Sequence, residues 1–154
     1  MISRRFYSMK ELAPVIEQTV SDGRKVKFTI TGNSMFPLFS DRRDRVIVEK
    51  AESVKKYDIV LHLRDDGHYI LHRVIGVKNG LYTIAGDNEI SKERNVRPDQ
   101  IIAKVTAFER KDRECTTDSK LYKLYSRVWL LIFPFRRVLL GIMLSVRRRF
   151  CAKK

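Results

Sequence analysis

The chain has 154 residues, of which 44% are apolar and 32% are charged. This balance is typical of one globular domain with a hydrophobic core, and it excludes a disordered or low-complexity chain. The net charge of +14 is unevenly distributed, because residues 120–154 carry ten Lys or Arg side chains and no Asp or Glu. The remaining residues are nearly balanced in charge.

Two further features concern the cellular compartment. Cys115 and Cys151 are the only cysteines and lack the spacing of a metal site, so we expect free thiols in a reducing compartment. Residues 1–5 include two arginines, but no apolar segment follows them. We therefore expect no secretory leader.

Residues 8–21 are predicted to form a short helix. Ser8 and Glu11 have the spacing of a capping box, in which each side chain caps the backbone of the other. Apolar side chains recur at helical intervals, at Leu12, Val15, Ile16 and Val20. Pro14 interrupts this pattern, so we expect the helix to start nearer Pro14 than Met9, since the first turn tolerates proline. A single helix also excludes a helix-turn-helix motif.

Most of residues 25–109 are predicted to be β-strand. Apolar and polar residues alternate from Val26 to Ile30 and from Val46 to Val48, as in half-buried strands. Two hairpin turns, Asp65-Asp66-Gly67 and Lys78-Asn79-Gly80, flank a segment that is apolar on both faces. Further strands are expected at 59–61, 81–84 and 101–108, and a surface loop at 88–98. The pattern predicts a mainly β fold, a small coiled sheet or barrel-like domain.

Residues 110–119 are polar and are predicted to link the β-domain, residues 1–109, to a basic amphipathic tail, residues 120–154. Apolar side chains recur at helical spacing in the tail, at Leu121, Leu124, Tyr125, Val128, Leu131 and Ile132. Pro134 ends this pattern, and a second apolar run covers 138–144.

Arg136 and Arg137 lie between the two apolar runs and disfavour a membrane-spanning helix. Each arginine costs about 2.5–3.5 kcal/mol at a helix centre, which cancels the gain from about a dozen apolar residues. We expect two amphipathic helices in the interface of an anionic, cytosolic membrane face, with Trp129 and the arginines at headgroup level. The alternative is that residues 120–133 pack on the β-domain as ordinary core.

Ser34 follows the first predicted strand, within residues 29–37. Gly32 permits a sharp backbone turn, and Met35 is a flexible apolar side chain beneath the serine. This arrangement presents a hydroxyl at the end of a strand. A serine acts as a nucleophile only with a base in hydrogen-bond reach. A simple polar turn is the alternative interpretation.

Five further segments follow Ser34 in order. They are Asp44 to Lys50 with alternating valines, Tyr57-Asp58-Ile59-Val60, Leu71-His72-Arg73-Val74-Ile75-Gly76, Ala85-Gly86-Asp87-Asn88 and Ile101-Ile102-Ala103-Lys104-Val105. Over about residues 26–106 the set resembles the signal peptidase I superfamily (S24/S26-like serine peptidases) and the related self-cleaving repressor proteases. It is most similar to the endoplasmic-reticulum, archaeal and sporulation-type branch, where histidine replaces the lysine of most bacterial enzymes.

The resemblance implies Ser34 as nucleophile and His72 as its base. His72 shares a strand face with Ile70 and Val74 and should point inward; a buried structural histidine is the alternative. A histidine base needs a carboxylate to orient it. The matching segment supplies Asp87, which could instead cap a turn. Glu93 and Asp99 are the alternative candidates for this carboxylate.

Other titratable residues are assigned structural roles. His62 and His68 are expected to be solvated, and Asp44 and Asp58 to cap turns. Lys50 and Lys104 are not positioned like the catalytic lysine of the bacterial branch. No metal or nucleotide motif is present, so we expect no metal and no cofactor.

The oxyanion hole is expected to use the amide of Ser34, with Gly32 and Asn33 as further candidates. Many signal peptidases add a serine hydroxyl from the position that is Gly32 here. Thr31 or Asn33 would have to replace that donor, so the resemblance leaves a slow enzyme open.

The expected function is a serine endopeptidase that cleaves a precursor or leader peptide, bound as an added strand at a sheet edge. A catalytically weak or inactive peptide- or membrane-binding module on the same fold is the alternative. Nucleic-acid binding is not expected, because the positive charge accompanies long aliphatic side chains and not aromatic side chains on a sheet.

Overall fold

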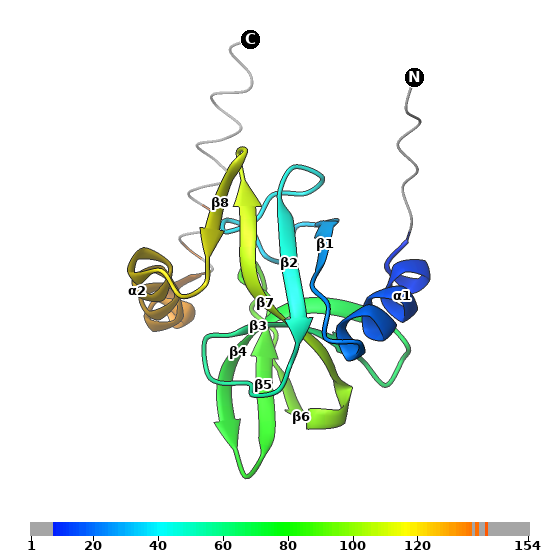
Figure 1. Ribbon diagram of the computed structural model, residues 1–154. Coiled ribbons are helices and arrows are strands. Elements are labelled where there is room, and N and C mark those ends of the chain that lie inside the picture. The colour runs from blue at the N-terminus through cyan, green and yellow to red at the C-terminus, as the bar shows by residue number, and fades with distance from the viewer. Residues whose placement is uncertain (1–7, 137, 139–140, 142–154) are drawn as a thin grey trace.

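A computed structural model describes residues 8–136, 138 and 141. These form one antiparallel sheet with a helix at each end of the sequence (Figure 1). The elements in chain order are α1 (Met9–Ser21), β1 (Val26–Thr29), β2 (Arg45–Lys50), β3 (Ile59–Leu63), β4 (Tyr69–Lys78), β5 (Leu81–Ala85), β6 (Glu93–Val96), η1 (Pro98–Gln100), β7 (Ile101–Arg110), β8 (Arg113–Thr116), α2 (Lys120–Leu131) and η2 (Phe133–Phe135).

The sheet runs β1-β2-β7-β3-β4-β5-β6, with β8 paired to β7 outside this path. The register shifts within four of the pairings, between Ile47 and Val48 among others. Such bulges bend strands and increase their twist. The hairpin of β4 and β5 consequently extends away from the end of the sheet that holds β8 (Figure 1). The expected mainly β fold is confirmed, and the sheet formed by the described residues is open and not closed into a barrel.

Two hydrophobic clusters stabilise the sheet. The larger one joins Ile16 and Val20 of α1 to Val46 and Val48 of β2, as the alternation in β2 predicts. The smaller one lies under β4 and β5 and contains Val60, Val74, Ile84 and Val96. Complete burial of one such side chain contributes about 1.5–3 kcal/mol.

Helix α1 begins at Met9, and Ser8 and Glu11 form the predicted capping box. Pro14 lies inside the helix, so the expected later start was wrong. The side chain of Pro14 is exposed, as is Lys10 one turn earlier. Water can therefore hydrogen-bond to the Lys10 carbonyl that proline leaves without a backbone donor.

Two segments expected to be irregular contain strands. Residues 88–98 include β6, where Val96 is buried opposite Tyr82. The segment expected as a linker, residues 110–119, includes β8. Its hairpin turns at Lys111 and Asp112, whose φ angles are 50° and 61°. Such turns favour Asn-Gly or Asp-Gly, so a Lys-Asp pair gives little signal in the sequence.

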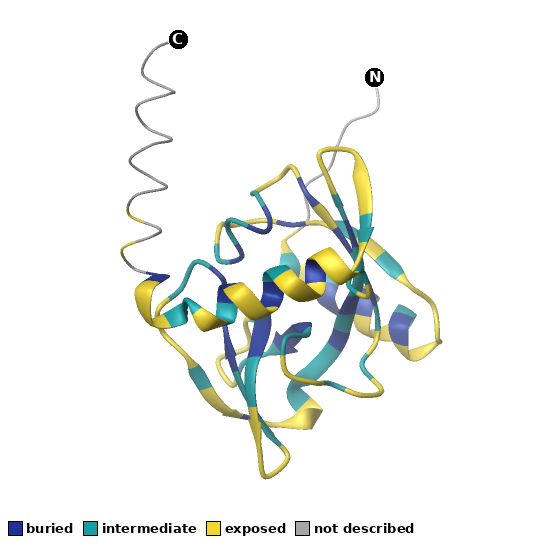
Figure 2. Cartoon of the chain, turned by 90° about the vertical axis from the view of Figure 1, so that its left-hand side faces the viewer, coloured by how far each residue is buried: buried dark blue, intermediate teal, exposed yellow. Residues whose placement is uncertain are grey.

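Helix α2 packs on the β-domain through Tyr122, Ser126 and Trp129, which are buried. Trp129 was expected at headgroup level, but its Nε1 donates to the carbonyl of Asp87 over 3.3 Å. Leu121, Leu124, Val128 and Leu131 are exposed, and most of the helix is coloured as exposed in Figure 2. The helix thus contacts the domain, although not through its apolar stripe.

Part of the tail lies outside the described residues, including Arg137, most of the second apolar run and the last arginines. Within the described residues, no helix is both long and apolar enough to cross a membrane. Cys115 is a free thiol in β8, and Cys151 also lies outside the described residues.

Candidate active site

Ser34 lies in a turn between β1 and β2 and is half-buried. The turn begins at Gly32, whose φ of 90° is readily adopted only by glycine. The Gly32 amide donates to the Asp41 carboxylate over 2.7 Å, which anchors the turn. Met35 is 2% exposed and packs in the core beneath the serine, as expected.

The loop after β5 holds the serine turn from the other side. The carbonyl of Ser34 accepts a hydrogen bond of 2.7 Å from the Asn88 amide. A Cβ atom on Gly86 would lie only 2.6 Å from the same carbonyl oxygen. Any larger residue at this position would therefore displace the serine turn or the loop.

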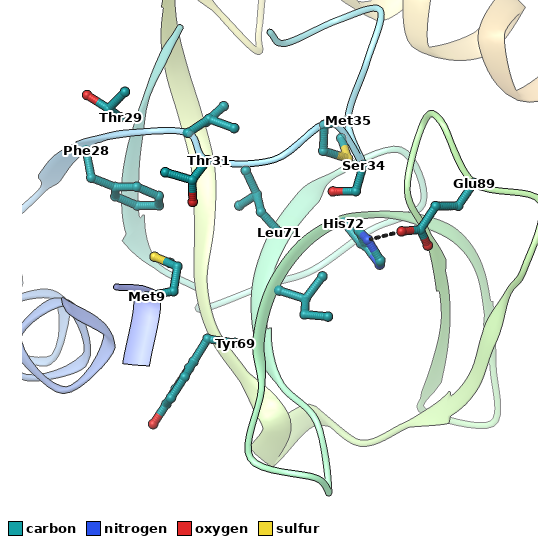
Figure 3. A pocket seen from close by; sticks show the side chains of 12 residues that line it. Met9, Phe28, Thr29, Thr31, Ser34, Met35, Tyr69, Leu71, His72 and Glu89 are labelled. Atoms are coloured by element: carbon teal, nitrogen blue, oxygen red, sulfur yellow. Dashed lines mark ion pairs between the residues drawn. The ribbon is translucent and has the colours of Figure 1, made fainter. Parts of the chain in front are cut away.

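His72 lies on β4, opposite Val60 of β3, and is 1% exposed. It points inward, as predicted. Ser34 and His72 line the same pocket, with a volume of about 290 Å³ (Figure 3). The other walls come from α1, β1 and the start of β4, and include Met9, Phe28 and Leu71. The structure thus brings the expected nucleophile and base to one cavity.

The carboxylates near His72 belong to glutamates. Glu93 Oε1 lies 3.3 Å from His72 Nδ1, and Glu89 Oε1 lies 3.5 Å from Nε2 (Figure 3 marks the second pair). These contacts lack hydrogen-bond geometry, so both ring nitrogens are without a hydrogen-bond partner among the described residues. Buried polar atoms without partners are unusual outside functional sites.

Asp87, expected to orient His72, binds Arg73 instead. Both carboxylate oxygens accept from the guanidinium over 2.8 Å, and both side chains are 1% exposed. Arg73 also donates to the Tyr57 carbonyl and to the hydroxyls of Tyr122 and Ser126. A buried guanidinium requires such a counter-ion, and this requirement takes up the Asp87 carboxylate.

Arg136 closes the same loop from the tail. It is 2% exposed and donates to the backbone carbonyls of Gly86, Asp87 and Glu89. Its guanidinium also lies 3.7 Å from the centre of the Phe133 ring. The expectation that this arginine reaches headgroup level was therefore wrong.

His62 was expected to be solvated but is 1% exposed. Its Nε2 lies 3.3 Å from Glu93, which also receives hydrogen bonds from Arg64. The hairpin at residues 65–67 explains the position, because the β3–β4 register brings His62 and His72 to one face with ring centres 5.9 Å apart. This register was the signal in the sequence that could have revealed His62. His68 is exposed in its turn, as expected.

Burial and the neighbouring His62 lower the pKa of His72 to about 4. The ring is therefore neutral at neutral pH, as a general base must be. Burial and the charge of Glu93 raise the pKa of Glu89. Burial also acts to raise the pKa of Glu93, but hydrogen bonds from Arg64 and His62 outweigh it and lower that pKa. Glu93 is thus the more firmly ionised of the two glutamates.

The candidate oxyanion donors differ in availability. The Gly32 amide is taken by Asp41, which removes it from the expected set. The Ser34 amide has no acceptor among the described residues. Asn33 is exposed, and Thr31 is exposed and lines the pocket.

The remaining acidic residues and lysines lie in structural contacts. Asp44 accepts from the Ser40 amide and pairs with Arg43, and Asp58 accepts from the Lys55 amide, so both cap turns as predicted. The alternative candidate Asp99 contacts Arg97, and Lys104 donates to the carbonyl of Ser53. Lys50 is exposed at the end of β2. The described residues contain no group of three or more side chains arranged to hold a metal ion.

A comparison with protein families matches residues 5–106 to the Peptidase S24-like family. The match covers about two-thirds of the chain and includes Ser34, His72, Glu89 and Glu93. A search of curated proteins finds no match. The matched segment contains the pocket, β1 to β6 and most of β7, whereas β8 and α2 lie beyond it. The chain therefore belongs to the S24-like family of peptidases.

Proposed function

We propose that the protein is a serine endopeptidase in which Ser34 is the nucleophile and His72 the general base. The observation that carries this proposal is the shared pocket, which is lined by a half-buried serine and by a buried histidine without hydrogen-bond partners. The low pKa of His72 keeps its ring unprotonated at neutral pH, the form that a general base requires. The Ser34 amide is the oxyanion donor that the geometry leaves available.

Glu93 is the carboxylate that orients the base. It lies at Nδ1, the nitrogen opposite the one that would receive the serine proton. Arg64 fixes its position and keeps it ionised. Asp87 then serves the mechanism indirectly, because its pairing with Arg73 anchors the loop that contacts Ser34.

The substrate would be an extended peptide, such as a precursor or leader segment. β1 is the terminal strand of the sheet, and residues 69–72 of β4 pair only with β3, since pairing with β5 begins at Arg73. The pocket thus lies between two strand edges that can each hydrogen-bond to an added backbone. Phe28, Leu71 and Met9 would contact apolar substrate side chains.

A mixture of proteome-derived peptides, analysed by mass spectrometry, tests this function without a known substrate. The wild-type protein should generate new peptide termini with a consistent sequence preference, and Ser34→Ala should generate none. Ser91→Ala changes an exposed serine and serves as the matched control. Equal cleavage by wild type and Ser34→Ala would reject Ser34 as the nucleophile.

A peptide-binding module without catalysis is the second candidate. It is favoured by the Glu89 contact with Nε2 of His72 and by the engaged Gly32 amide. In that case the wild-type protein and Ser34→Ala would retain the same peptides from the mixture, and neither would cut them.

A further inference from the structure

Helix α2 packs on the β-domain with its polar and aromatic face, which is unusual for an amphipathic helix. Its buried face carries Tyr122, Ser126 and Trp129, which bind the Arg73–Asp87 pair and the Asp87 backbone. Four of its five large aliphatic side chains are exposed, namely Leu121, Leu124, Val128 and Leu131. Amphipathic helices normally bury the aliphatic face. Here the buried ion pair holds the helix, so the aliphatic face remains outside.

Exposed apolar residues recur from α2 through η2, and we call this set the outer stripe. Six large side chains recur at intervals of three and four residues and are 48–79% exposed. They are Leu121, Leu124, Val128, Leu131, Phe135 and Val138. Monomeric soluble proteins rarely expose a contiguous apolar surface of this kind without an interaction partner.

A groove continues the outer stripe towards the active-site loop. Its volume is about 650 Å³, and its apolar walls include Ile75, Ile90, Leu131 and Phe133. Leu131 belongs to both surfaces, and Ile90 follows Glu89 in the loop beside His72. Lys56 and Lys92 form the rim of the groove and are exposed.

The charges around these surfaces are positive. Lys120, Lys123 and Arg127 are exposed on α2, and no acidic residue occurs from Ser119 onward. With the two rim lysines, the apolar surface is flanked by cations. Apolar side chains with flanking lysines and arginines are the features of an interfacial helix on an anionic membrane.

We propose that the outer stripe and the lysine-rimmed groove dock the protein on an anionic phospholipid bilayer. The stripe enters the boundary between headgroups and acyl chains, the groove accepts an acyl chain, and Lys56 and Lys92 contact the phosphate. A second copy of the chain fits less well, because two such surfaces would bring like charges together. A continuous coiled coil is also disfavoured, since α2 ends at Leu131 and the stripe crosses η2 with Pro134.

Flotation of the full-length protein with vesicles tests the proposal. The wild type should float with vesicles of phosphatidylcholine and phosphatidylglycerol, and weakly with phosphatidylcholine alone. Leu124→Glu/Leu131→Glu should reduce binding at least about 10-fold. Val15→Glu/Val77→Glu, which alters exposed apolar residues of α1 and β4 and adds the same charge, should bind like the wild type.

The groove has its own matched pair of variants. Lys56→Glu/Lys92→Glu should weaken binding about 10-fold or more, since each basic residue near the surface contributes about 1 kcal/mol. Lys10→Glu/Lys78→Glu changes the net charge equally at exposed sites elsewhere and should bind like the wild type. Every variant retains residues 142–154, so a difference reports only the substituted side chains.

Three outcomes would overturn the proposal. The first is unchanged flotation of the stripe or groove variant, and the second is equal binding of the wild type to neutral vesicles. The third is a wild-type dimer in light scattering that the stripe variant converts to monomer while neither floats, which would make a second copy the occupant. The emission of Trp129, the single tryptophan, shows whether α2 stays docked in each variant. If Leu124→Glu/Leu131→Glu loses the wild-type emission of Trp129, the variant Leu124→Ser/Leu131→Ser is used in its place.

Discussion

His72 and Arg73 are neighbours on β4 and are equally buried, yet their surroundings differ. Arg73 makes hydrogen bonds to four residues, two of them in α2. His72 contacts two carboxylates without a hydrogen bond. A fully satisfied buried network stabilises one geometry, whereas an unsatisfied group retains the capacity to bind a proton or substrate. Arg73 therefore has a structural role, whereas His72 keeps two unpartnered ring nitrogens, as the proposed general base would.

The largest effect is expected on the His72 side. Ser34→Ala and His72→Ala should each reduce kcat/KM on an identified peptide on the order of 10³-fold or more, and the double variant should be little worse. Ser34→Ala should leave the free energy of unfolding within about 1 kcal/mol of wild type. Additive losses would show that the two residues act separately.

On the Arg73 side, Asp87→Asn should lower the free energy of unfolding by about 3–5 kcal/mol, because the buried guanidinium loses its counter-ion. Urea unfolding measures this change. Asp99→Asn, which removes an exposed ion pair with Arg97, should change it by less than about 1 kcal/mol. If the Asp87→Asn variant were as stable as the wild type but inactive, Asp87 would have a catalytic role and not the structural role proposed for it.

Glu93→Gln should show the opposite pattern to Asp87→Asn. We expect kcat/KM to fall about 100-fold or more, as for the loss of a general acid–base contribution, because the neutral amide no longer stabilises protonated His72. Arg64→Ala removes the Glu93 ion pair but keeps the carboxylate, and should be milder. Full activity of Glu93→Gln would exclude the proposed orienting role.

Gly86→Ala tests the contact that joins the two sides. The added methyl group would lie 2.6 Å from the Ser34 carbonyl oxygen, so we expect a loss of about 1–3 kcal/mol in stability together with lower kcat. Gly76→Ala is the control, since its Cβ would meet Thr83 at an ordinary 3.7 Å. Similar effects of the two substitutions would contradict the close approach.

The smallest effect is a gradual one with pH. Activity should fall on acidification with a midpoint near pH 4, because the pKa of His72 is lowered to about 4 by burial and by His62. In the unfolded state, His72 keeps its ordinary pKa of about 6.5 and therefore binds a proton at a higher pH than in the folded state. The contribution of neutral His72 to stability is thus complete above about pH 6.5 and is lost as the pH falls towards 4. A kcat/KM midpoint near 6.5 would indicate a solvated His72.

The sequence predicted Ser34 and His72 because each lies in a distinctive local segment. It ranked Glu93 only behind Asp87 as the partner of His72, since that contact depends on β6, a strand with little apolar signal. The buried face of α2 was also missed. Helical periodicity identifies an apolar stripe, but here the ion pair of Arg73 and Asp87 attracts the polar and aromatic side chains instead. Hydrogen bonds between residues far apart in the sequence produce no periodic pattern within either segment.

The hydrogen bonds from Arg136 to the carbonyls of the loop at residues 86–89 can form only late in protein synthesis. Arg136 is added 47 residues after Glu89, which at about 5–20 residues per second means a delay of roughly 2–9 seconds. During that interval the nascent chain contains Ser34 and His72, but the loop beside them lacks its guanidinium clamp. The loop beside Ser34 therefore acquires its guanidinium contacts only after residues 8–135 have been synthesised.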